Sequence, residues 1–180
     1  MDTKTPQELN QAGKSAYQSG DYLAAAQAFE AAAAGFSAQG LPLDAAEMAN
    51  NQSVSLLQAG EAQAALDALA GSEAAFASAG DIHRQAMAIG NQAAALDALG
   101  QLPEAEAAYL RSAELLQQSG DEQLRANVIQ SISRVQMRSG RQLEALATMQ
   151  AGLDSIEKPS LRQRMLKKLL KAPFKLLNRS

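Results

Sequence analysis

Residues 17–40 read YQSGDYLAAAQAFEAAAAGFSAQG, a helix-forming segment that contains Gly20 and ends at Gly40. Glycine ends a helix easily, because it adopts the left-handed backbone conformation without steric cost. Asp21 then stands where an aspartate can cap the next helix by accepting a free backbone N–H. We therefore predict one helix over about residues 7–19 and a second over about residues 22–38, with a turn at Gly20.

The same pattern returns with a period of forty residues, so residues 1–160 divide into four copies, 1–40, 41–80, 81–120 and 121–160. Single glycines mark each half of a copy at Gly20, Gly40, Gly60, Gly80, Gly100, Gly120 and Gly140. Apolar columns also repeat, and the main ones hold Ala25, Ala65, Ala105 and Ala145; Phe29, Leu69, Tyr109 and Met149; and Phe36, Phe76, Leu116 and Ile156. Within a copy these residues are three or four positions apart, which places them on one face of a helix. We predict an all-α chain of four helix-turn-helix repeats whose stacking buries these faces.

The columns resemble the tetratricopeptide repeat family. The resemblance rests on Gly13, Gly20, Tyr22, Ala25, Phe29 and Ala32 in the first copy, and on Ala93, Leu96, Gly100, Ala105 and Tyr109 in the third. The usual unit of that family has about 34 residues, so each helix here is about one turn longer. The resemblance covers residues 7–157 and implies a right-handed α-solenoid.

The same resemblance implies a concave groove, lined mainly by the first helix of each copy, that binds an extended or helical peptide. The positions that match are Asn10, Lys14, Tyr17, Asn50, Asn51, Val54, Leu57, Asn91, Asp97, Asn127, Arg134 and Met137. An asparagine amide both donates and accepts, so it can hold a peptide backbone; the alternative is that these are exposed positions that simply tolerate asparagine. A carboxylate clamp of the type found in one subclass is not expected, because Met87 and Asn91 occupy the places of its last two basic residues.

Residues that support catalysis or metal binding are scarce. The chain has no cysteine and one histidine, His83, which we place on the surface near the start of a helix. A Gly-x-Ser-x-Gly elbow and a glycine-rich phosphate loop are both absent from the sequence. We expect no enzyme activity, no metal and no cofactor.

Residues 161–180 have a different charge from the rest of the chain. They hold 7 of the 16 lysines and arginines and none of the 19 acidic residues, so residues 1–160 carry 9 − 19 = −10 and the tail carries +7. On a helical wheel, one half of the tail is apolar and holds Met165, Leu166, Leu169, Leu170, Phe174, Leu176 and Leu177. The other half is basic and holds Arg164, Lys167, Lys168, Lys171, Lys175 and Arg179. We predict an amphipathic helix that Pro173 kinks or breaks.

Three interpretations of this tail are open. It caps the exposed end of the array or docks on the array's own acidic surface, it lies in the interface of an anionic membrane, or it enters a hydrophobic groove of a partner. Nucleic acid is not expected, because the acidic body would repel phosphate.

The first functional hypothesis is a non-catalytic scaffold or adaptor that binds a protein partner. The alternative is a peripheral membrane protein recruited by residues 161–180. The N-terminal ten residues, MDTKTPQELN, contain no apolar run, so we expect a cytoplasmic protein, held at the inner face of a membrane if the tail binds lipid.

Overall fold

The computed structural model describes residues 4–154, 161, 164 and 165, and within them the chain is all-helical, without a β-strand. Most of the predicted tail helix lies outside the described residues. The helices are α1 (Pro6–Gln18), α2 (Tyr22–Ala38), α3 (Pro42–Gln58), α4 (Ala62–Ala68), α5 (Ser72–Ser78), α6 (Ile82–Ala98), α7 (Leu102–Ser119), α8 (Glu122–Arg138) and α9 (Gln142–Asp154). The bounds of α1 and α2 agree with the prediction to within one residue.

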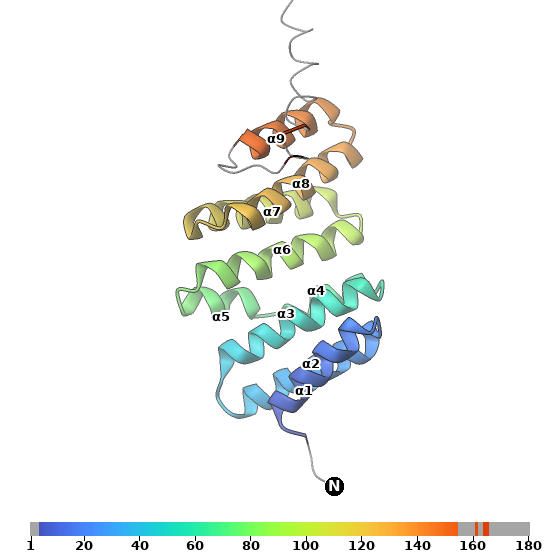
Figure 1. Ribbon diagram of the computed structural model, residues 1–180, viewed down its shortest axis with the longest axis vertical. Coiled ribbons are helices and arrows are strands. Elements are labelled where there is room, and N and C mark those ends of the chain that lie inside the picture. The colour runs from blue at the N-terminus through green and yellow to red at the C-terminus, as the bar shows by residue number, and fades with distance from the viewer. Residues whose placement is uncertain (1–3, 155–160, 162–163, 166–180) are drawn as a thin grey trace, which may run out of the picture.

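The helices follow one another in chain order along the long axis of the molecule (Figure 1). Most helices pack on their neighbours in sequence, and α3 also contacts α5 of its own copy and α6 of the next copy. Packing of this kind, with few contacts between distant parts of the chain, is what a repeat array produces. The first helices of the four copies are α1, α3, α6 and α8.

The predicted glycine turns are confirmed. All seven predicted glycines have positive φ angles, for example +85° at Gly60 and +77° at Gly100. At Gly60, the backbone N–H donates to the Leu57 carbonyl and the next N–H, of Glu61, donates to Leu56. These two bonds satisfy carbonyl groups that the end of α3 would otherwise leave without partners.

Three aspartates cap the helices that follow the turns. The carboxylates of Asp21, Asp81 and Asp121 accept hydrogen bonds from the backbone N–H groups three residues on, at 3.2, 2.9 and 2.9 Å. The cap predicted for Asp21 is therefore confirmed. Leu41, Glu61 and Gln101 stand at the same place in other turns and make no side-chain cap.

The repeated apolar columns form the core. Ala25, Ala65 and Ala105 are completely buried, as are Phe76 and Leu116, while Phe29 and Tyr109 are nearly so. Small residues let neighbouring helices approach closely: a Cβ atom at Gly13 of α1 would lie only 2.8 Å from Cε1 of Phe29 in α2. Interlocking large and small residues of this kind produce dense helix packing.

The second copy departs from the two-helix unit. Its second helix is broken into α4 and α5, and the break contains Gly71 with a φ of +83°. The corresponding positions of the first and third copies hold Ala31 and Arg111, which continue α2 and α7 without interruption. Glycine costs about 1 kcal/mol relative to alanine inside a helix, and that penalty favours the break. Leu69 and Phe76 stay buried on either side of it, so the core columns survive the interruption.

Replacing Gly60 tests whether the turn depends on glycine. A Cβ atom at Gly60 meets no other atom within 4 Å, so any cost of a substitution comes from the backbone angle. We expect Gly60→Val to lower the free energy of unfolding by at least about 1 kcal/mol, because a β-branched residue resists the left-handed conformation. Urea melts followed by circular dichroism measure the loss. Gly60→Asn is the control with a smaller expected loss, since asparagine tolerates that conformation; equal stability of Gly60→Val and wild type would contradict the assignment.

Candidate functional site

Two hollows lie along the first helices of the copies, and residues predicted from the sequence line both. The first hollow has a volume of about 260 Å³ and brings together Lys14 and Tyr17 of α1 with Asn51 and Val54 of α3. Gln18 and the edge of Phe29 complete it. Four of the predicted partner-binding residues, from two copies of the repeat, therefore share one concavity.

The second hollow has a volume of about 280 Å³ and is lined by α6, α7 and α8. Three predicted residues, Asn91, Asn127 and Arg134, are on its wall. The other lining residues, mostly apolar, are Ala86, Met87, Gly90, Ala94, Tyr109, Ser112, Leu116, Leu124, Val128 and Ser131. The arrangement is an apolar floor with a few polar groups, as in surfaces that receive side chains of a partner.

Tyr109 takes a place in this hollow that the sequence did not predict, because we assigned it to the core. It is indeed 4% exposed, yet it contributes to the wall beside Arg134 and Ser131. Burial raises the pKa of the Tyr109 phenol, and the neighbouring Ser131 only partly opposes that effect. The phenol therefore stays neutral at physiological pH and retains its hydrogen-bonding proton.

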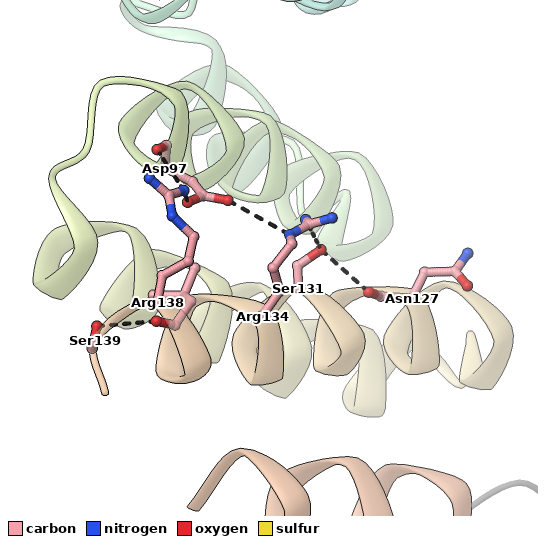
Figure 2. Close-up of polar contacts among 7 residues, drawn as sticks. Asp97, Asn127, Ser131, Arg134, Arg138 and Ser139 are labelled. Carbon is pink, nitrogen blue, oxygen red and sulfur yellow. Dashed lines mark hydrogen bonds and ion pairs between the residues drawn. The ribbon is translucent and has the colours of Figure 1, made fainter. Parts of the chain in front are cut away.

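A polar cluster adjoins the second hollow where α8 faces α6 (Figure 2). Arg138 donates from Nη1 to a carboxylate oxygen of Asp97 and, at 3.1 Å, to the Asp97 main-chain carbonyl. Arg134 approaches the other carboxylate oxygen of Asp97, with its Nε at 3.8 Å. Asp97 is only 8% exposed, so two arginines from the fourth copy surround a buried carboxylate of the third copy.

Arg134 is held at a second point on its own helix. Its Nη2 donates to the Ser131 hydroxyl at 3.0 Å, and that hydroxyl is 3.4 Å from the main-chain carbonyl of Asn127. The Arg134 side chain is nevertheless 61% exposed. The guanidinium is thus oriented by Asp97 and Ser131, with the Tyr109 phenol as a further neighbour, and is still presented to solvent at the wall of the hollow.

The remaining predicted residues have different surroundings. Asn50, predicted to lie on the partner-binding surface, is 6% exposed, and its Oδ1 accepts a hydrogen bond from Nδ2 of Asn91 at 3.3 Å. The Asn50–Asn91 pair links α3 to α6, so Asn50 makes a contact between copies and lines neither hollow. Asn10 and Leu57 are half-buried and line neither hollow.

Polar links between successive copies are the feature that sequence reasoning missed. Arg84 is 3.4 Å from Glu47, Arg111 is 2.5 Å from Glu73, and His83 is 3.7 Å from Asp121. The partners in these pairs are 37 or 38 residues apart, close to one repeat period, and that spacing was the available signal. His83 is exposed at the start of α6, as predicted.

The link between Arg141 and Glu106 joins the third copy to the fourth. Arg141 pairs with the Glu106 carboxylate, which also accepts from Nε2 of Gln136 at 2.9 Å. Burial opposes ionisation of Glu106, but the hydrogen bonds from Arg141 and Gln136 outweigh burial, and the pKa of Glu106 is lowered. Glu106 is therefore ionised at neutral pH and the link is a true ion pair.

Within the described part of the chain, no group of three or more histidine, cysteine or acidic side chains could hold a metal ion, and no helix is long and apolar enough to cross a membrane. Of the predicted tail residues, Arg164 and Met165 are described and exposed. The other predicted tail residues lie outside the described range: Leu166, Lys167, Lys168, Leu169, Leu170, Lys171, Phe174, Lys175 and Leu177.

No protein-family model matches this chain, and no curated protein is significantly similar to it in sequence.

A double-mutant cycle tests the coupling of α6 to α8 through Asp97. We expect Asp97→Ala and Arg138→Ala each to lower the free energy of unfolding, because hydrogen bonds to a charged and largely buried partner contribute about 1.5–3 kcal/mol. The double variant should lose less than the sum of the single losses, by at least about 0.5 kcal/mol. Asp97→Ala combined with Arg111→Ala is the matched control, since Arg111 pairs with Glu73 and shares no partner with Asp97. Strict additivity in the Asp97–Arg138 pair would mean that the contact contributes nothing.

Proposed function

We propose that residues 1–160 form a right-handed α-solenoid of the tetratricopeptide type and act as a non-catalytic scaffold or adaptor. The partner is a protein that places an extended segment or a helix along α1, α3, α6 and α8. The observation that carries the proposal is that two hollows lie on these helices and that seven of the predicted residues line them.

The size of the hollows favours side chains over whole cofactors. Sites for small molecules typically have volumes of about 300–1,000 Å³ and enclose most of the ligand. The two hollows are smaller, at about 260 and 280 Å³, and each is open to solvent along the helix surface. They suit separate side chains of one longer ligand, with the backbone of that ligand running between them.

The chemistry of the walls also suits a peptide. Asn51 and Asn91 bring amides and Tyr17 brings a phenol close to apolar surface from Val54 and Met87. Amide groups satisfy the donors and acceptors of a peptide backbone whatever its sequence, while apolar floors select the side chains. Polar groups for the backbone and apolar surface for the side chains suit a peptide-binding module.

The solenoid part of the proposal is supported by the local packing. The helices contact their neighbours in order, and each reversal of direction is made by the same glycine turn. A two-helix unit cannot bury its own apolar face, so stacked units share a continuous core.

Filling the hollows tests the proposal. We expect the full-length protein to select binders from a display library of random peptides, and the variant Asn51→Trp with Asn127→Trp, which fills the hollows without changing their charge, to bind the selected peptides at least about tenfold more weakly, a change of about 1.4 kcal/mol. The matched control is Gln27→Trp with Gln117→Trp, which adds the same bulk at exposed positions of α2 and α7. Peptides whose affinity is insensitive to the hollow variant would place the binding surface elsewhere.

A second candidate function rests on the charge of the tail. Residues 161–180 carry seven basic and no acidic side chains, and basic residues near an anionic membrane each contribute about 1 kcal/mol. We propose as the alternative that this segment recruits the array to anionic lipid. The described tail residue Met165 is 60% exposed, which is compatible with contact to another surface.

Vesicle flotation with phosphatidylserine-containing liposomes tests this alternative. We expect the protein to float with these vesicles at low salt and to dissociate as salt is added, because salt screens the attraction. Leu169→Asp with Leu170→Asp should abolish binding and leave the melting temperature of the array nearly unchanged. Absence of flotation at low salt rules out membrane recruitment, and a large fall in melting temperature of the variant indicates that the tail caps the array.

A further inference from the structure

We infer that the partner of the second hollow presents an acidic side chain, within an internal stretch of its chain, that pairs with Arg134 of this protein. This inference rests on the proposed function, since it names the chemistry of the ligand for the same surface. It is carried by the charge of the hollow, the way in which Arg134 is held, and the apolar surface beside it.

The hollow is basic on an otherwise acidic body. Among the described residues that line it, Arg134 is the only charged one. The adjoining cluster of Asp97, Arg134 and Arg138 adds one negative and two positive charges, a net +1, whereas residues 1–160 as a whole carry −10. The first hollow has the same character, because Lys14 is its one charged lining residue. A ligand that is complementary along both hollows is therefore acidic.

Of the two arginines, Arg138 makes the closer contacts with Asp97. Arg138 bonds both the carboxylate and the main-chain carbonyl of Asp97, whereas Arg134 stands 3.8 Å from the carboxylate through Nε alone. The second contact of Arg134, to Ser131, uses Nη2. The Tyr109 phenol is a third neighbour, with which the Arg134 side chain also interacts. Asp97, Ser131 and Tyr109 thus position the guanidinium, while more than half of the side chain stays exposed.

The surroundings of Arg134 strengthen a bond to a carboxylate. Met87, 39% exposed, and the half-buried Ala94 and Leu124 line the same hollow. A partner seated on this apolar surface displaces water, and a charge-assisted hydrogen bond is stronger where water is excluded. A guanidinium that is already oriented also loses less side-chain freedom when it binds. The ligand is therefore an aspartate or glutamate with an apolar residue close by in sequence.

The experiment is a peptide-display selection on the full-length protein, followed by synthesis of enriched sequences with amidated C-termini and titration by fluorescence anisotropy. We expect enriched peptides to share an acidic residue next to an apolar one. Amidation removes the terminal carboxylate, so binding that persists assigns the contact to a side chain, and binding that disappears overturns the inference in favour of a C-terminal carboxylate.

Arg134→Gln should lower the affinity for the amidated peptide at least about tenfold. Replacing the acidic residue of the peptide by the corresponding amide, Asn or Gln, should lower its affinity for the wild-type protein equally. The protein and peptide changes combined should lower the affinity little more than either change alone. Arg111→Gln is the matched control, because Arg111 is exposed on α7 and lines neither hollow. Asp97→Asn should weaken binding in the wild-type background and have no effect in the Arg134→Gln background, which distinguishes positioning from a general loss of structure.

The outcomes separate the two proposals. Enriched peptides without acidic residues, or equal affinity for wild type and Arg134→Gln, overturn this inference while the scaffold function stands. Failure to enrich any peptide overturns the proposed function and this inference with it. Binding of inorganic phosphate or of anionic vesicles that depends on Arg134, in place of peptide binding, also overturns the inference.

Discussion

The structure depends on one backbone constraint, the left-handed glycine that ends a helix every twenty residues. At each such glycine the chain makes two hydrogen bonds back to the last turn of the helix and reverses direction. Because the reversals are equally spaced, the helices that run unbroken between two of them, α2, α3, α6, α7 and α8, have 17 or 18 residues and place their apolar faces against one another. The core columns, with Phe29, Leu69 and Tyr109 at equivalent places, can form only when these reversals occur in register.

Packing of neighbouring helices leaves part of the surface of α1, α3, α6 and α8 free for other contacts. Polar side chains on this surface make two kinds of contact. Some link one copy to the next, as Asn50 does with Asn91 and Asp97 with Arg138. Others, such as Asn51 and Arg134, stay on the walls of the hollows. Links between copies fix the spacing of the hollows, so the same contacts that hold the array together also set the geometry of the surface proposed to bind a partner.

Irregularities in the array arise where a single residue departs from its column. Gly71 takes the place of Ala31 and Arg111 and breaks the second helix of its copy into α4 and α5. The buried residues on both sides of the break keep their places, and the hollow that opens beside it, about 350 Å³, is lined by Leu66, Gly71 and Ala88 among others. The array therefore tolerates a local change of backbone as long as the apolar columns are preserved.

Apart from the break at Gly71, the sequence by itself determined the described helices, turns and core. These follow from local rules: glycine accepts positive φ, aspartate caps the next helix, and apolar residues three or four apart share a face. The sequence also predicted that Lys14, Asn51 and Arg134 line one surface, and the structure places the first two at the first hollow and Arg134 at the second. Only the tertiary structure decided which polar residues form contacts between copies. Asn50 and Asn51 are adjacent and chemically identical, yet a rotation of about 100° around the helix directs one toward α6 and leaves the other at the first hollow. The pairing of Asp97 with Arg134 and Arg138 likewise depends on how far one copy is turned relative to the next, and that angle results from the packing of whole helices, which no local pattern specifies.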